Sequence, residues 1–157
     1  MEMPEIISGG NHTDTRGKIT FVNEFDMSEV KRFYIIENAN TDIKRGWRAH
    51  KIEQRWFSVS EGEYKVQLVR IDNWETPNKN LPFTEFLLSA KDIEVLHIPA
   101  GYASCLQATK RNSRIIVFAD YLVDHAPKDN YLYPDDYFAC KTKIITEIPV
   151  NRYNELI

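Results

Sequence analysis

The residues best suited to chemistry lie in one short basic stretch of the sequence. Residues 44–51 read Lys-Arg-Gly-Trp-Arg-Ala-His-Lys and contain four permanent cations and one histidine. A histidine can accept and release a proton near neutral pH, and a guanidinium can hold an anionic group through a fork of donors. The stretch therefore indicates an anionic ligand and a proton transfer, although a solvated basic surface would have the same composition.

The elements that must position this stretch are predicted to be β-strands. β-Branched and aromatic residues alternate in short runs that are bounded by Gly, Pro, Asn and Asp. The regular spacing of these runs predicts an all-β sandwich, jelly roll or barrel, and the length of 157 residues suits a single domain, 1–157. We expect brief helical turns at 28–31 and 134–138, and strands at 18–23, 32–37, 46–60, 64–72, 83–89, 94–98, 103–108, 114–121 and 143–147.

If residues 46–60 form one strand, alternate side chains share one of its faces. That face would carry Arg48, His50, Ile52, Gln54 and Trp56. Such a mixture of cationic, polar and apolar groups suits neither a core nor a solvated surface, so it predicts the wall of a pocket. The intervening positions 53 and 55 would point away from the pocket, where we expect a surface ion pair.

Two motifs resemble those of the cupin family. Gly46, positions 48, 50 and 54, and Gly62 follow the order of the first cupin motif, which is Gly, His-x-His, Glu or Gln, and Gly. Residues 99–104, Pro-Ala-Gly-Tyr-Ala-Ser, follow the spacing of the second motif, Pro-x-Gly-x-x-His. The resemblance implies an all-β fold, the cupin double-stranded β-helix of jelly-roll type.

The positions that hold the metal in a metal-binding cupin are altered in this chain. They are occupied by Arg48, His50, Gln54 and Ser104. A guanidinium stays protonated and cannot be a metal ligand, and one imidazole alone does not hold an ion. We therefore expect no metal and no other cofactor, which excludes dioxygenases and metal-dependent isomerases.

Longer strings resemble the metal-free sugar-nucleotide cupins, and the similarity covers about residues 13–138. The strings are residues 14–17, 31–36, 45–51, 97–101 and 120–121. They are most similar to the dTDP-4-keto-6-deoxyglucose 3,4-ketoisomerases, whose signature is Arg-Gly-x-His-Ala-His-Lys, and more distantly to dTDP-4-dehydrorhamnose 3,5-epimerase. This resemblance implies removal of a proton next to the 4-keto group of a dTDP-linked sugar and its return elsewhere, through an enediol or enolate.

The resemblance names His50, Tyr121 and Arg48 as the catalytic candidates. Arg48 stands where the ketoisomerases carry the histidine that acts as base, and arginine is not deprotonated in proteins. Proton transfer would then pass to His50 or to a tyrosinate, Tyr34 or Tyr121, while Arg48 would stabilise an enolate oxygen. The alternative is a catalytically silent protein that only binds the sugar nucleotide.

The resemblance also names substrate-binding candidates. Arg45 matches a phosphate-contacting arginine, and Tyr34 matches a tyrosine that lines the sugar site. The other candidates for this role are Gln54, Lys51 and Ser104.

The remaining expectations concern partners and location. Relatives of this kind are homodimers, so we expect a homodimer. A formal net charge of −3 and the division of the local cations between two strand faces argue against nucleic-acid binding. The sequence has no apolar run of the roughly 20 residues that a membrane-spanning helix needs. Residues 1–10 do not resemble a secretory signal, and Cys105 and Cys140 lack CxxC spacing, so we expect a cytoplasmic protein with free thiols.

Overall fold

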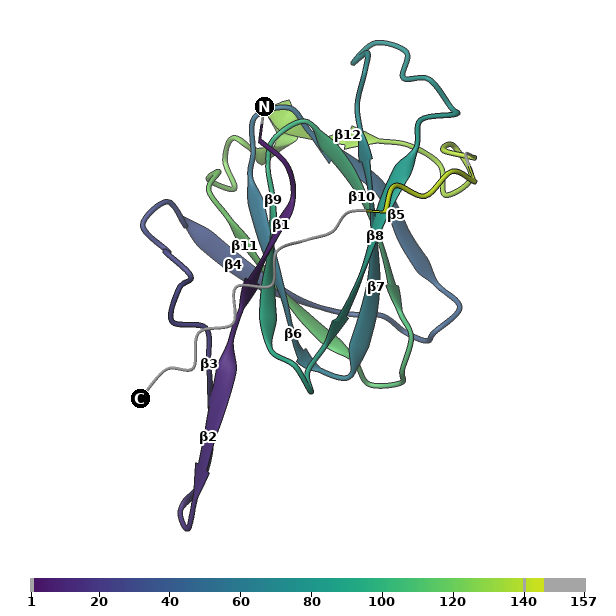
Figure 1. Cartoon of the computed structure of the whole chain (residues 1–157). Helices are drawn as coiled ribbons and strands as arrows, with labels where there is room; N and C mark the ends of the chain where they lie inside the picture. The colour runs from purple at the N-terminus through teal and green to yellow at the C-terminus, as the bar shows by residue number, and fades with distance from the viewer. Residues whose placement is uncertain (1, 140, 146–157) are drawn as a thin grey trace.

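The computed structural model describes residues 2–139 and 141–145, and its strands form two facing sheets of five strands each (Figure 1). The first sheet has the order β1-β9-β6-β11-β4, and the second has the order β12-β5-β10-β7-β8. The first consists of β1 (Glu5–Ser8), β4 (Arg32–Glu37), β6 (Arg55–Glu61), β9 (Glu94–Ile98) and β11 (Arg114–Ala119). The second consists of β5 (Lys44–His50), β7 (Glu63–Arg70), β8 (Phe83–Ser89), β10 (Tyr102–Ala108) and β12 (Tyr131–Leu132).

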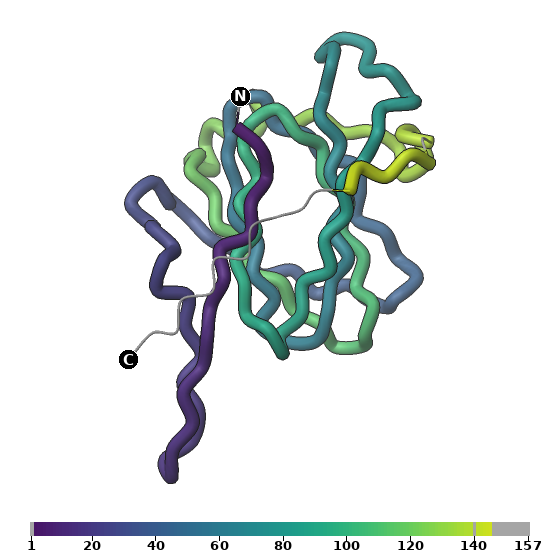
Figure 2. Tube along the Cα trace, in the orientation of Figure 1, coloured from purple at the N-terminus to yellow at the C-terminus, as the bar shows by residue number. Residues whose placement is uncertain are grey.

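The chain passes back and forth between the two sheets as it advances. It runs from β4 in the first sheet to β5 in the second, to β6 in the first, to the hairpin β7–β8 in the second, to β9 in the first, to β10 in the second and to β11 in the first (Figure 2). Neighbouring strands pair antiparallel throughout both sheets. This winding of a double sheet confirms the predicted all-β jelly roll.

Apolar side chains from both sheets meet in the space between them and form the main core. Phe57 and Val59 of the first sheet pack there with Val66 and Leu68 of the second, and all four are almost fully buried. The alternation of buried and half-exposed residues in β7 and β11 follows from the period of two along a strand. The core therefore fixes which side chains of each strand can point into the space between the sheets.

A second apolar cluster covers the outer face of the second sheet. Trp47, Ala49 and Ala103 belong to it, and Phe138 packs its ring against Trp47 at a centroid distance of 5.2 Å. The aromatic segment 131–138 thus packs on the outside of the barrel, and the structure has only a turn at the expected helical position 134–138. Residues 28–31 likewise form a turn.

The prediction of one strand over 46–60 is wrong. β5 ends at His50 and β6 begins at Arg55, and the two strands belong to opposite sheets. The shared face expected from position 48 to position 56 therefore does not exist, because the chain turns between the sheets at residues 51–54. The expected strand at 143–147 extends beyond the described residues, and Lys143 forms a single β-bridge to Phe83.

A two-stranded hairpin projects away from the sandwich (Figure 1). It consists of β2 (Gly10–Asp14) and β3 (Gly17–Phe21), and the side chains of residues 11–20 are all exposed. At its tip the Asp14 carboxylate accepts hydrogen bonds from the backbone and side chain of Arg16. Within the described residues, no helix has the length and apolar character needed to cross a membrane.

Candidate functional site

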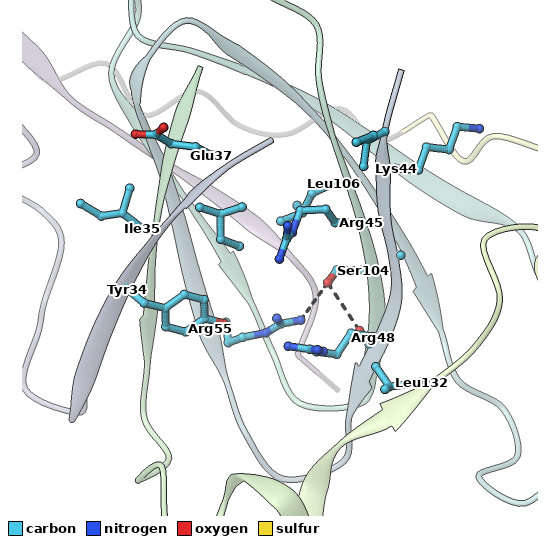
Figure 3. Close-up of a pocket in the computed structure, with 13 residues that line it drawn as sticks. Tyr34, Ile35, Glu37, Lys44, Arg45, Arg48, Arg55, Ser104, Leu106 and Leu132 are labelled. Atoms are coloured by element: carbon cyan, nitrogen blue, oxygen red, sulfur yellow. Dashed lines mark hydrogen bonds between the residues drawn. The ribbon is translucent and has the colours of Figure 1, made fainter. Parts of the chain in front are cut away.

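A cavity of about 590 Å³ lies between β4 of the first sheet and β5 and β10 of the second (Figure 3). Its size falls in the range of small-molecule sites. Four of the expected site residues line it, namely Arg45, Arg48, Tyr34 and Ser104. The rest of its lining consists of Ile35, Ile36, Glu37, Ile43, Lys44, Gly46, Arg55, Leu106 and Leu132.

Arg45 and Arg48 reach the same cavity because β5 contains a bulge. Opposite β10, Arg48 pairs with Ser104 and Arg45 pairs with Leu106, so three steps along β5 match two steps along β10. Without this extra residue, side chains three positions apart would lie on opposite faces of the strand. Gly46 permits the bulge, because a Cβ there would lie only 2.5 Å from the Cys105 sulfur.

The inner end of the cavity is formed by two guanidinium groups and one hydroxyl. The Arg55 Nη2 donates a hydrogen bond of 2.8 Å to the Ser104 Oγ, and the Arg48 guanidinium lies beside this pair (Figure 3). Arg55 also interacts with the hydroxyl of Tyr34, which comes from β4 of the same sheet. Burial lowers the pKa of the Arg55 guanidinium, while Tyr34 and the Glu53 carboxylate oppose that change, and the group stays protonated.

The expected surface ion pair of Glu53 and Arg55 is contradicted by the structure. Both side chains are buried, with exposed fractions of 2% and 5%. Glu53 accepts a hydrogen bond of 3.2 Å from Arg32, and its other oxygen lies 3.9 Å from the Arg55 Nε. The alternation along β5 does not extend to these residues, because they follow the turn between the two sheets and β6 has faces of its own.

A single buried carboxylate shapes that turn. Asp129 ends the 3₁₀ helix η1 (Ala126–Asp129) and accepts hydrogen bonds from the backbone N–H groups of Lys51, Ile52 and Glu53, at 2.7, 2.9 and 2.7 Å. The amides of this turn would otherwise have no strand partner. Asp129 therefore holds the Glu53 side chain behind Arg55.

His50 is buried behind the cavity and is not part of its lining. Its Nδ1 lies 2.6 Å from the backbone oxygen of Asp129, and its Nε2 lies 3.9 Å from a Glu53 carboxylate oxygen. Burial, followed by the positive charge of Arg55, lowers the pKa of His50 to about 3. The imidazole is therefore neutral near pH 7, and its Nδ1 carries the proton that the backbone oxygen accepts.

Burial also raises the pKa of the neighbouring Glu53 carboxyl, although Arg55 and Arg32 oppose this effect.

The other three expected site residues also lie outside the cavity lining. The Gln54 amide joins Asp120 to His97, donating to the Asp120 carboxylate and placing its oxygen 2.8 Å from the imidazole Nε2. Tyr121 accepts a hydrogen bond from Arg32 at its backbone oxygen. The Lys51 side chain is exposed.

Sequence reasoning missed Arg55 and Lys44 as lining residues. Lys44 is part of the basic stretch and could have been included on charge alone. No feature of the sequence indicated that Arg55 lines the cavity, because the direction of its side chain depends on the turn that separates it from His50. Among the described residues no group of three or more His, Cys, Asp and Glu side chains could hold a metal ion.

A family model described as FdtA: WxcM-like, C-terminal matches residues 1–143. The chain belongs to this family. None of the curated proteins matches the sequence significantly. The family membership agrees with the resemblance to metal-free sugar-nucleotide cupins.

Solved structures similar to this member of the family include two ketoisomerases and one epimerase. A 3,4-ketoisomerase from Helicobacter canadensis superimposes with a TM-score of 0.64 at 18% identity, over 87% of this chain and 95% of that one. The sugar 3,4-ketoisomerase QdtA from Thermoanaerobacterium thermosaccharolyticum, solved in complex with TDP, gives 0.64 at 20% identity, over 87% and 92%. The rmlC epimerase from Mycobacterium tuberculosis gives 0.68 at 15% identity, over 87% and 72%. At these identities the similarity establishes the cupin fold.

Proposed function

We propose that the cavity binds a nucleoside-diphosphate sugar, and that the chain acts on a dTDP-4-keto-6-deoxyhexose by proton transfer next to the keto group. The observation that carries the proposal is the convergence of Arg45, Arg48 and Arg55 in one cavity of suitable size. Guanidinium groups suit both a diphosphate and an oxygen on which negative charge develops. The fold similarity to dTDP-sugar isomerases and epimerases supports the same substrate class.

The positions of the lining residues suggest a division of roles. Lys44 and Arg45 are exposed and suit the diphosphate. Arg55 and Ser104 are buried at the inner end, and the Arg48 side chain, which is also exposed, lies beside them. A keto oxygen placed between the Arg48 and Arg55 guanidinium groups would be stabilised as it becomes an enolate. Tyr34 contributes the phenolic hydroxyl of the lining, and it is our candidate for exchanging the proton.

A catalytically silent sugar-nucleotide binder is the second candidate function, and the position of His50 favours it. The imidazole is outside the cavity lining, and a pKa of about 3 makes it a weak base. Arg48 occupies the position at which the 3,4-ketoisomerase signature has its catalytic histidine. On this alternative the same cavity holds the ligand without exchanging its protons.

Deuterium exchange separates the two candidates. The protein is incubated with dTDP-4-keto-6-deoxyglucose in D₂O, and the label at C3 and C5 is followed by NMR, while binding is measured by calorimetry. Exchange at C3 alone supports a 3,4-ketoisomerase, and exchange at both carbons supports a 3,5-epimerase. Binding without exchange supports the silent binder, and absence of binding to this sugar and to dTDP contradicts the proposal.

The exposed hairpin supports the further proposal that the protein is a homodimer. Residues 11–20 have exposed side chains, and Phe33 and Ile35 of β4 are 65% and 54% exposed. A lone hairpin gains little stability in water, so contact with a second copy would account for both features. Light scattering on a sizing column should give twice the mass of the 18.4 kDa chain, and a monomer would contradict the proposal.

A further inference from the structure

Arg55 is the buried cation at the inner end of the cavity, and a carboxylate lies behind it. Arg55 is 5% exposed and donates a hydrogen bond of 2.8 Å to the neutral hydroxyl of Ser104. A Glu53 carboxylate oxygen lies 3.9 Å from the Arg55 Nε and outside the cavity lining. An ionised carboxylate at this distance attracts the guanidinium and repels an enolate that forms in the cavity. The protonation state of Glu53 therefore affects how strongly Arg55 can stabilise an enolate.

The structure offers a place for a proton on Glu53. The Glu53 Oε1 and the His50 Nε2 are both buried, and neither has a hydrogen-bond partner within the described part of the chain. The two atoms lie 3.9 Å apart. The His50 Nδ1 carries the proton that the backbone oxygen of Asp129 accepts, so the Nε2 is itself an acceptor. One proton on the Glu53 Oε1 would satisfy both facing acceptors once they move about 1 Å closer.

The charges around this pair are balanced between the two states of Glu53. The charged groups that face the pair are Arg32 of β4, Arg48 of β5, Arg55 of β6, Asp120 after β11 and Asp129 of η1. Burial raises the pKa of the Glu53 carboxyl, whereas the charges of Arg55 and Arg32 lower it. Negative charge that reaches Arg55 from the cavity weakens this opposing effect. Uptake of a proton by Glu53 and formation of an anion in the cavity therefore favour each other.

We propose that Glu53 is a positioning residue for the proton transfer: it takes up a proton from solvent, shares it with His50, and so directs the charge of Arg55 to the enolate oxygen. This inference rests on the proposed function and adds a residue that acts through Arg55 without touching the reacting atoms. No bond of the sugar takes part, because the proton enters from solvent and returns to it. The ionised carboxylate holds the Arg55 charge behind the cavity wall, and the protonated carboxyl releases it.

The rate of deuterium exchange at C3 of dTDP-4-keto-6-deoxyglucose, measured from about pH 5 to 8, tests the inference. Glu53→Gln keeps the size of the side chain and resembles the protonated state, because its amide can donate to the His50 Nε2. The exchange rate of this variant relative to the native protein should be lowest at the acid end and rise to roughly tenfold at the alkaline end. A ratio that is constant with pH would overturn the inference and leave the proposed function standing.

Ligand affinity and a control variant separate this role from a general structural one. Glu53→Gln should change the affinity for dTDP by less than about twofold, because Glu53 acts on the enolate and not on the diphosphate. A change in affinity as large as the change in rate would contradict the positioning role. Glu24→Gln alters an exposed side chain and should match the native rate at every pH.

NMR of the native protein gives a second test, which stands even if Glu53→Gln does not fold. The ¹⁵N resonance of the His50 Nε2 should shift between about pH 5 and 8, because this atom accepts the proton that Glu53 donates. A resonance that stays constant over this range would overturn the shared proton. If the native protein binds dTDP without exchange at C3, the proposed proton transfer fails together with the inference. If it binds neither dTDP nor the sugar nucleotide, the whole proposed function fails.

Discussion

Asp129 is predicted to stabilise the protein far more than its place at the end of a short 3₁₀ helix would indicate. Its carboxylate is 1% exposed and accepts three backbone hydrogen bonds from the turn between β5 and β6. Asp129→Asn keeps the size of the side chain but replaces one acceptor oxygen by an N–H donor. At least one amide of the turn then faces another donor, and the charge that strengthens the remaining bonds is lost.

The size of the effect follows from the three contacts. A hydrogen bond to a charged group contributes about 1.5–3 kcal/mol, and an unpaired buried donor costs about 1–3 kcal/mol. The amides of Lys51 and Ile52 are only partly buried, so water compensates part of their loss. We expect Asp129→Asn to lower the free energy of unfolding by about 2–4 kcal/mol, a large share of the ~5–15 kcal/mol of a typical domain.

Urea denaturation followed by tryptophan fluorescence measures this change. The matched control is Asp124→Asn in the same segment, where the exposed side chain predicts a change below about 0.5 kcal/mol. The slope of the transition should be the same for both variants, so that the midpoint reports stability. If Asp129→Asn unfolds within about 0.5 kcal/mol of the native protein, the turn does not depend on this carboxylate and the reasoning is refuted.

Three further predictions concern the residues around the cavity. The pKa of His50 is lowered to about 3, so below pH 6.5 the unfolded chain binds a proton at this position that the folded chain does not. The free energy of unfolding should therefore decrease as the pH falls, by at most about 1.4 kcal/mol per pH unit. The raised pKa of Glu53 opposes this decrease near the acid end. Urea denaturation at several pH values between 6.5 and 5 should show that the free energy of unfolding depends less steeply on pH in His50→Asn, but not in the exposed control His12→Asn. The same pH dependence in His50→Asn and the native protein would contradict the buried neutral imidazole. Gly46→Ala should lower the free energy of unfolding by about 1–3 kcal/mol, because the new Cβ would lie 2.5 Å from the Cys105 sulfur. The double variant Gly46→Ala/Cys105→Ala should recover part of this loss. If it does not, the contact with Cys105 is not the cause. Burial raises the pKa of the Cys105 thiol to about 11, so peptide mapping should find iodoacetamide on Cys105 only after unfolding, and labelling of the folded protein would contradict its burial.

The strand pattern was predictable because burial alternates with a period of two in most of the sandwich. β7 and β11 follow the expected runs closely, since each has one face on the core. The same period fails within the basic stretch, where it places Arg45 and Arg48 on opposite faces of the strand. The bulge that brings them together is marked by Gly46, but a glycine alone does not show that a bulge is present.

The turn at residues 51–54 could not be predicted from its local sequence. It reads Lys-Ile-Glu-Gln and contains no glycine, proline, asparagine, aspartate or serine, so none of the usual turn residues marks it. The acceptor that makes the turn possible is Asp129, which is 76 to 78 residues further along the chain. The expectations for residues beyond His50, including the outward direction of Glu53 and Arg55, were therefore wrong, whereas Arg48 does line the cavity.

The dependence of this turn on Asp129 also sets an order for assembly of the protein during its synthesis. When residues 44–61 leave the ribosome, the backbone amides at positions 51–53 lack their native acceptor. That acceptor, Asp129, is synthesised only after β11. A chain that stops before residue 126 would contain every strand of both sheets except β12, but the support behind Arg55 would be missing. The inner end of the cavity is thus among the last parts of the fold to become complete, and partial translation products should not bind ligand.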